Sequence, residues 1–239
     1  MLPSVLETLA FNHSHRVPTA KIFEISYVYI KTTDDTDILP EHRQVISMGR
    51  YGEGDFYSFK GDIEALLQGF KIKNYEFEPV TDNPSMHPGR CAALIIGGKE
   101  AGFLGQIHPE TAENWECPED SFAAQINLEA ILKEAVDIPK NKELPKFPAV
   151  TRDIAVVVDK NIPAGHIEKM IRQRGGKHLE KCMLFDCYEG IQVGTGRRSL
   201  AYSLAFRDME KTMTDDEVNK IMKKILNGLE HEFQAELRN

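Results

Sequence analysis

The stretch that decides the fold is RDIAVVVDKNIPAGHIEKMIRQRGG, residues 152–176. Its first eight residues are rich in β-branched side chains and predict a strand. Pro163 follows and fits the first turn of a helix, where its missing N–H leaves no hydrogen bond unmade. The Gly175-Gly176 pair ends that helix. Its apolar stripe comes from three residues at helical spacing: Ile167, Met170 and Ile171.

The residues that follow predict a hairpin, a second helix and a last short strand. LEKCMLFDCYEG (179–190) and RRSLAYSLAFRD (197–208) read as strands joined by a glycine-rich turn. Thr214 and Glu217 form a capping box, in which each side chain satisfies a free backbone N–H at the start of a helix. A wide apolar face follows, made by Val218, Ile221, Met222, Ile225, Leu226, Leu229 and Phe233. AELR (235–238) fits a short edge strand.

The order β-α-β-β-α-β is that of the ferredoxin-like fold. We therefore expect residues 146–239 to form one domain with two helices on one face of a four-stranded antiparallel sheet. Strand alternation then separates the two faces of this sheet. Beneath the helices we expect Leu200, Tyr202, Leu204 and Phe206. On the open face we expect Ser199, Ala201, Ser203, Ala205 and Arg207, with Cys182, Leu184, Asp186 and Tyr188 from the neighbouring strand.

Residues 1–140 have a less regular pattern, which predicts an antiparallel α+β layer. A short helix near Leu6, strands at 21–30 and 42–50, a helix within 55–70 and a hairpin around Gly97-Gly98 are the expected elements. The sequence opens almost at once on a helical stripe, so we expect a truncation upstream. KEAVDIPKNKELPKFP (133–148), rich in Lys, Glu and Pro, is the expected linker.

Charge is distributed unevenly between the two parts. The net charge of -8 argues against nucleic-acid binding by the chain as one unit. From Lys146 onward, however, 16 Lys and Arg face 14 Asp and Glu, which leaves 13 basic and 23 acidic residues before it. An acidic front part and a mildly basic back part suggest different partners for the two.

Cysteine spacing and the amino terminus exclude several classes. The four cysteines form no CxxC pair and have no histidine at zinc-ligand spacing, so we expect buried reduced thiols and no metal site. Cys182 and Cys187 should lie on opposite faces of one strand. No secretory signal and no run of about 18 apolar residues is present, so we expect a cytoplasmic protein without a membrane partner.

At this point the sequence resembles a known family. FPAVTRDIAVVVDKNIPAG, LEKCMLFDCYEG, RRSLAYSLAFRD and KTMTDDEVNKIMKKI are together similar to the ferredoxin-fold anticodon-binding (FDX-ACB) domain that ends the β subunit of bacterial phenylalanyl-tRNA synthetase. Upstream, LPSVLETLAFNHSHR, KIFEISYVY, FYSFKGDIEALL and HPGRCAALIIGGKEAGFLGQIHPE resemble the class II synthetase catalytic-like domain of the same subunit. The resemblance covers nearly the whole chain.

The resemblance implies partners and substrates. In this family the β subunit joins an α subunit in an α2β2 phenylalanine-tRNA ligase, and the α chain holds the ATP and phenylalanine site. The complete enzyme uses ATP and magnesium, while the family's B5, editing and amino-terminal tRNA-binding modules are not in this sequence. We expect this portion to bind the anticodon arm of phenylalanine tRNA and to assemble with the α subunit.

No catalytic, cofactor-binding or metal-binding residue is predicted. ATP activation in class II enzymes needs arginines that offset charge on the reacting phosphate, and neither the FRxE nor the GxGxGxER pattern occurs. Phe23-Glu24-Ile25 lies on an expected core strand but lacks the arginine. The glycines at 49–54 fit a turn better than a phosphate loop. His87 and His108 are expected to punctuate strand ends rather than to move protons.

The expected RNA-binding residues lie in the second domain. Tyr188 offers a ring on which an unpaired base can stack, and arginines can contact phosphates or base edges. The predicted set is Arg152, Asp186, Tyr188, Arg197, Arg198, Ser199 and Arg207. Two alternatives stay open: Arg152 and Asp153 can instead pair with other strand ends to fix the fold, and Tyr188 can be an ordinary amphipathic edge residue. The helix lysines Lys220, Lys223 and Lys224 fit the solvated side of an amphipathic helix better than a binding patch.

Other functions remain possible at this stage. A ferredoxin-like domain can serve a self-sufficient enzyme or a metal-dependent regulator, but the sequence has no cofactor loop, no recognisable nucleophile with a base and no ligand cluster. A free-standing paralogue of the β-subunit tail, or an effector-binding module with a different partner, is the alternative to the synthetase role.

Overall fold

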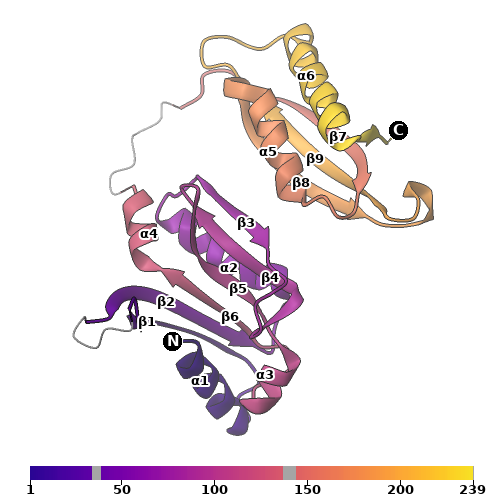
Figure 1. Cartoon of the computed structure of the whole chain (residues 1–239). Coiled ribbons are helices and arrows are strands. Elements are labelled where there is room, and N and C mark those ends of the chain that lie inside the picture. Colours follow the sequence, from indigo (N-terminus) through magenta and orange to yellow (C-terminus); the bar gives the residue numbers. More distant parts are fainter. Residues whose placement is uncertain (34–38, 137–143, 239) are drawn as a thin grey trace. The chain divides into compact units, whose positions relative to one another are not determined.

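The computed structural model describes residues 1–33, 39–136 and 144–238, which fall into two compact units, Met1–Lys140 and Asn141–Asn239 (Figure 1). The expected linker at 133–148 lies partly outside the described residues. Along the described parts of the chain, none of the helices combines the length and apolar character needed to cross a bilayer.

The first unit is a mixed α+β layer built on one antiparallel sheet. Its strands lie in the order β1-β2-β6-β5-β4-β3, and every neighbouring pair is antiparallel. The elements are α1 (Leu2–Ser14), β1 (Ala20–Ile30), β2 (Glu41–Tyr51), α2 (Phe56–Gly69), β3 (Tyr75–Pro79), β4 (Met86–Ile96), β5 (Lys99–Ile107), α3 (Pro109–Asn114), β6 (Phe122–Asn127) and α4 (Leu128–Glu134). The predicted antiparallel α+β class is confirmed.

Helices cover both faces of this sheet. Strand alternation sends Ile46 and Ala124 toward a core shared with Phe59 and Ile63 of α2 and Ile131 of α4. The opposite face packs against α1 and α3, in cores that include Leu6, Leu9 and Ala112. Residues 49–51 of the turn expected at 49–54 belong to β2, so the turn is shorter and lies between β2 and α2, where Gly52 and Gly54 have positive φ.

Strand β1 departs from the expectation of a core strand. It lies at the edge of the sheet, where β2 alone pairs with it among the residues that the structure describes. Phe23, Ile25, Tyr27 and Tyr29 alternate along it and are 70%, 48%, 50% and 72% exposed. Strand periodicity alone does not distinguish an edge strand from a central one, because both alternate in the same way.

The second unit has the predicted ferredoxin-like arrangement. Its elements are β7 (Val150–Asp159), α5 (Ala164–Gly175), the 3-10 turn η1 (Gly176–His178), β8 (Leu179–Tyr188), the 3-10 turn η2 (Ile191–Val193), β9 (Arg197–Phe206), α6 (Asp215–Phe233) and β10 (Glu236–Leu237). The sheet order is β10-β7-β9-β8, all antiparallel. Figure 1 shows α5 and α6 side by side over one face of this sheet.

The core of this unit is the one expected from alternation. Leu200, Tyr202, Leu204 and Phe206 are fully buried beneath the helices, together with Ile167, Ile171, Val218, Ile225 and Leu229. The capping box at the start of α6 is present, with Thr214 accepting from the Glu217 N–H and Glu217 accepting from the Thr214 N–H. The spacing of a few apolar residues therefore predicted which faces of α5 and α6 pack against the sheet.

An irregularity in β8 overturns part of the predicted face assignment. The register pairs Leu184 with Tyr202 but Asp186 with Ala201, so one extra residue is inserted between them. Asp186 and Tyr188 consequently lie on the open face, as predicted. Cys182 pairs with Leu204 and belongs to the core, and Leu184 also faces the helix side, so their predicted open-face positions are wrong.

The same irregularity corrects the cysteine predictions. Cys182 and Cys187 pair with Leu204 and Leu200, so the register puts them on the same face, not opposite ones. All four cysteines are free: Cys91 and Cys182 are buried, whereas Cys117 is half-buried and Cys187 is exposed. Burial raises the pKa of the Cys182 thiol to about 12, which keeps it protonated near neutral pH.

Candidate nucleic-acid interface

Tyr188 lies on the open face of the second sheet, at the end of β8. It pairs with Ser199 near the start of β9. The guanidinium carbon of Arg238 lies 4.7 Å from the centroid of the Tyr188 ring. A cation at this distance is attracted by the negative face of the ring, so tyrosine and arginine form one stacked pair.

Besides its contact with the Tyr188 ring, two hydrogen bonds hold Arg238 in place. Its backbone N–H donates to the carbonyl of Ala155 at 2.9 Å, which continues the pairing of β10 with β7. Its guanidinium donates to Oε1 of Gln192 at 3.1 Å. Arg238 and Gln192 were not among the predicted binding residues. Alternation along the expected AELR edge strand would put Glu236 and Arg238 on one face, but a strand this short forms only by pairing with β7.

Arg197 and Ser199 lie beside this stack. The Arg197 guanidinium donates to Glu236 Oε1 at 2.9 Å and to the Val157 carbonyl at 3.3 Å. Ser199 has Tyr188 and Val157 as its strand neighbours and is only 3% exposed. Ser199 therefore lies on the open face as expected but is not itself accessible.

Asp186 adds a carboxylate to the same face. It pairs with Ala201, two positions along β9 from Ser199, and its side chain is exposed. A carboxylate repels phosphate but accepts hydrogen bonds from amino groups on base edges. Its position suits contact with a base rather than with the RNA backbone.

Two predicted arginines lie on the helix side instead. Arg198 pairs with Val158, and its guanidinium donates to the Ile162 carbonyl at 2.6 Å, before α5. Arg152 pairs with Leu204 and forms an ion pair with Asp215, the first residue of α6. The ion pair of Arg152 matches the alternative in which this residue pairs to fix the fold. Arg198, for which only binding was predicted, likewise bonds within its own domain.

Arg207 lies at the far end of the sheet. It follows β9, eight residues from Ser199, which corresponds to roughly 26 Å along an extended strand. Its Nε donates to Glu180 at 2.8 Å, and its guanidinium also binds the Phe147 carbonyl. The structure thus brings together Asp186, Tyr188, Arg197 and Ser199 but separates them from Arg207.

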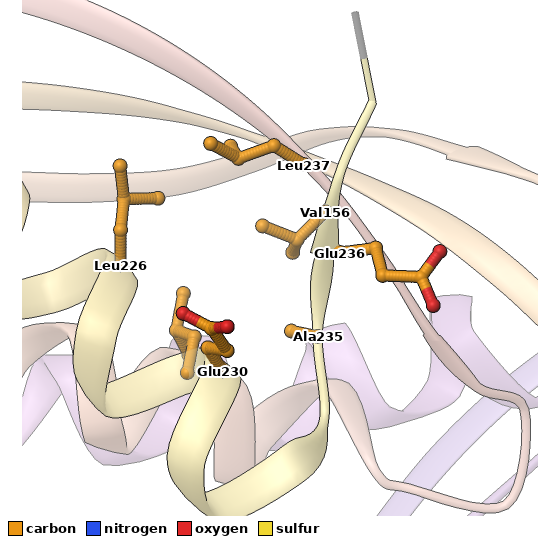
Figure 2. Close-up of a pocket in the computed structure, with 7 residues that line it drawn as sticks. Val156, Leu226, Glu230, Ala235, Glu236 and Leu237 are labelled. Atoms are coloured by element: carbon orange, nitrogen blue, oxygen red, sulfur yellow. The ribbon is translucent and has the colours of Figure 1, made fainter.

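Strand β10 divides this site from a hollow on the helix side. The hollow has a volume of about 310 Å³ and is lined by Val156, Leu226, Leu229, Glu230, Ala235, Glu236 and Leu237. Figure 2 shows Leu226 and Leu237 bordering it, while the carboxylate of Glu236 points away from Leu226. The hollow thus lies on the helix side of β10, whereas the side-chain hydrogen bonds of Glu236 and Arg238 lie on the open face.

The segments around His87 and His108 have structural contacts. His108 caps α3, its Nδ1 accepting from the Glu110 N–H at 3.3 Å, and His87 Nδ1 accepts from the Gly89 N–H at 3.0 Å. Within residues 1–33, 39–136 and 144–238, no three His, Cys, Asp or Glu side chains gather as metal ligands do.

Chemically, the assembled face can bind an unpaired base in three ways. A ring provides stacking, typically worth about 1–3 kcal/mol per base. Guanidinium groups can contact phosphate or a base edge, and Asp186 can accept from exocyclic amines. These are features of single-stranded RNA recognition rather than of covalent catalysis.

Comparison with known proteins places both units of the chain in one family. The family model described as the phenylalanyl tRNA synthetase beta chain CLM domain matches residues 1–128, and that of the ferredoxin-fold anticodon binding domain matches residues 145–238. Proteins named phenylalanine–tRNA ligase beta subunit are 42% identical in Clostridium acetobutylicum, 41% in Clostridium tetani and 38% in Symbiobacterium thermophilum.

These alignments cover 99%, 99% and 100% of this chain but only 30%, 30% and 28% of the relatives, so the chain spans about a third of their length or less. A solved pyrrolysyl-tRNA synthetase from Desulfitobacterium hafniense is 21% identical, over 55% of this chain and 46% of that one, with a TM-score of 0.43. With one family model over its first 128 residues and a second over 145–238, the chain belongs to the phenylalanyl-tRNA synthetase beta-chain family.

Proposed function

We propose that this chain is a non-catalytic portion of a phenylalanine-tRNA ligase that holds the anticodon arm of tRNA and assembles with an α subunit in an α2β2 enzyme. The named relatives and the anticodon-binding domain match at 145–238 support this proposal. ATP and magnesium would be used by the complete enzyme, whose reacting site would lie on the α subunit. The separate alternative is a free-standing tail paralogue or effector module with another partner.

The observation that carries the RNA-binding part is the Tyr188–Arg238 stack on the open sheet face. Helices occupy the other face, so this is the broad side of the domain that remains accessible. The Tyr188 ring and the Asp186 carboxylate are on β8, and the Arg197 guanidinium is on the adjacent strand β9. A splayed anticodon base can therefore stack while its edge and its phosphate reach polar groups.

A fluorescence-anisotropy titration with a phenylalanine-tRNA anticodon arm tests this assignment. Tyr188→Ala should weaken binding by about 1–3 kcal/mol at moderate salt, because it removes the stacking surface. Lys223→Ala on the exposed side of α6 should change it much less, since a lone surface charge adds only screened attraction. Arg207→Ala should have a smaller effect than Tyr188→Ala, because its guanidinium is already bonded to Glu180 and Phe147.

The RNA would have to dock elsewhere under one result. If folded Tyr188→Ala bound like wild type while substitution of Lys220, Lys223 and Lys224 abolished binding, the helix face would be the RNA site. Near-ultraviolet circular dichroism of each variant confirms that the comparison concerns folded protein.

The apolar edge strand β1 supports the assembly part. Monomeric proteins rarely leave a row of large apolar side chains and an unpaired strand edge in water. Phe23, Ile25, Tyr27 and Tyr29 form such a row, and β1 has β2 on only one side. The α subunit is the partner that we propose for this strand.

Co-expression with an α subunit from one of the relatives, followed by affinity co-purification, tests that partner. The double variant Phe23→Ser, Tyr29→Ser should lose the complex, because it removes the two most exposed members of the row. Tyr57→Ser is a matched control, since Tyr57 is 74% exposed but lies on α2. Retention of the complex by the double variant, or equal loss by the control, would contradict the assignment.

A further inference from the structure

The turn between β8 and β9 presents a fully exposed aliphatic side chain. Ile191 begins the 3-10 turn η2 and is 100% exposed. It follows Tyr188 by three residues and directly precedes Gln192, which accepts a hydrogen bond from the stacked Arg238. No described part of the chain covers this side chain. Removing apolar surface from water lowers the free energy, so a ligand that covered Ile191 would be stabilised.

The turn is held by a hydrogen bond that spans Ile191 and by the two residues that follow it. Val193 is 7% exposed, and its N–H donates to the Gly190 carbonyl at 3.1 Å. Gln192 accepts from the Arg238 guanidinium at 3.1 Å. Of the two residues that follow Ile191, Val193 is therefore buried and Gln192 is bonded to the stacked arginine.

Gly190 ties the turn to the tyrosine ring. A Cβ at Gly190 would lie 2.4 Å from the Tyr188 hydroxyl oxygen and 2.7 Å from the ring carbon that bears it. The ring thus lies directly against the backbone of the turn. Ile191 is the next residue along that backbone.

We infer that Ile191 is a second base contact, which covers an unpaired nucleotide next to the one stacked at Tyr188. The inference rests on the proposed RNA-binding function. An aliphatic side chain makes no base-specific hydrogen bonds, so it would add affinity with little sequence preference, as stacking platforms do. Its role would be to fix the position of the loop, leaving discrimination to polar groups such as Asp186.

The test is anisotropy of an anticodon-arm RNA with three variants of the full chain. Ile191→Ala should raise the Kd roughly five- to tenfold, because it removes aliphatic carbons that the base would bury. Ile191→Leu should restore binding to within about twofold, because it conserves volume. Met209→Ala is the matched control: Met209 is 54% exposed and lies beyond the opposite end of β9, so its Kd should not change.

The outcomes separate this inference from the proposed function. If Tyr188→Ala weakens binding and Ile191→Ala does not, the Ile191 contact is wrong while the RNA face stands. If neither variant has an effect, the RNA face itself is wrong and the inference falls with it. Equal weakening by Ile191→Ala and Met209→Ala would mean a general apolar effect and would also overturn the inference.

Discussion

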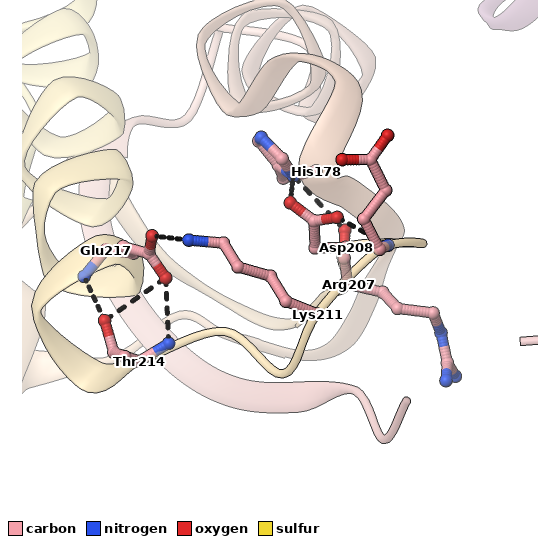
Figure 3. Close-up of polar contacts among 7 residues, drawn as sticks. His178, Arg207, Asp208, Lys211, Thr214 and Glu217 are labelled. Carbon is pink, nitrogen blue, oxygen red and sulfur yellow. Dashed lines mark hydrogen bonds and ion pairs between the residues drawn. The ribbon is translucent and has the colours of Figure 1, made fainter. Parts of the chain in front are cut away.

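Glu217 carries several interactions at the start of α6. Its Oε2 accepts from the Thr214 N–H at 3.0 Å and from the Thr214 hydroxyl at 3.2 Å, while Oε1 pairs with Lys211 (Figure 3). The hydrogen bond from Lys211, followed by that from the Thr214 backbone, lowers the pKa of this carboxyl from 4.5 to about 2. The Glu217 carboxyl is therefore ionised in the folded protein near neutral pH.

This lowered pKa predicts a pH dependence of stability. A carboxyl whose pKa is lower in the folded state stabilises the fold above its unfolded pKa and loses that contribution as pH falls through the folded value. We expect Glu217→Gln to lower the free energy of unfolding most at neutral pH. The difference from wild type should shrink between pH 4.5 and about 2, as followed by urea unfolding at several pH values.

Glu232→Gln, at the other end of the same helix, is the control for the change in net charge. It should not reproduce the narrowing difference, because it lies outside the capping box. A Glu217→Gln difference that stayed constant down to pH 3 would show that this carboxyl has the same pKa in the folded and unfolded states, and so that the cap does not lower it.

Some residues of the candidate site could be predicted from the sequence, and others could not. Tyr188, Asp186, Arg197 and Ser199 were found because they follow strand alternation, and the structure brings them together. Arg238 was missed because its strand has two residues and forms only by pairing with β7. A short edge strand has almost no periodicity of its own, so its side chains are placed by tertiary pairing.

At the scale of elements, β5 and β6 approach unusually closely at Gly102. A Cβ there would lie 2.1 Å from the Gln125 carbonyl oxygen and 2.7 Å from the Ile126 Cα. The β4–β5 ladder shifts register next to this point, between Leu94 and Ile95. Glycine in a strand commonly marks such a close backbone approach, where no side-chain movement can relieve the contact.

Gly102→Ala should therefore destabilise the first unit by about 2 kcal/mol or more, because the backbone of β6 would have to move. Gly61→Ala makes the same chemical change within α2, where a Cβ meets nothing within 4 Å, and should stabilise by up to about 1 kcal/mol. Denaturant unfolding compares the two. Similar shifts of both variants in one direction would contradict the role of the close approach.

The elements themselves were largely readable from the sequence. Every helix and strand of the ferredoxin-like unit was expected from alternation, helical spacing and the capping box, and its sheet order follows from the fold class. The inserted residue in β8 was not readable, because LEKCMLFDCY alternates plausibly in either register. Cys182 and Leu184 were assigned to the wrong face for that reason.

At the scale of the whole chain, the two units should be separable domains. They have separate hydrophobic cores, and the family models end and begin at residues 128 and 145. Cleavage by a lysine-specific protease under native conditions should occur first within 133–148 and release a folded fragment of the second unit. Mass spectrometry locates the cuts. Uniform resistance through that segment, with cuts inside β7 or α6 instead, would contradict independent domains.

The chain alone should not make phenylalanyl-adenylate. The reacting phosphate gains negative charge in the transition state, and arginines positioned on it supply most of the stabilisation in class II enzymes. Neither arginine motif occurs in the sequence. Arg50, which is buried in the first unit, is already bonded to Asp62 at 2.9 Å and to the Glu53 carbonyl, with its side chain 5% exposed.

Phenylalanine-dependent ATP–pyrophosphate exchange measures this step directly. The purified chain should give only background exchange, because a buried, paired arginine is not available to a nucleotide phosphate. A catalytically active complete enzyme from one of the relatives, assayed in parallel, shows that the conditions support the reaction. Exchange by this chain free of α subunit, and abolished by Arg50→Gln in a folded variant, would identify Arg50 as a phosphate ligand. The first unit would then be an enzyme rather than an assembly surface.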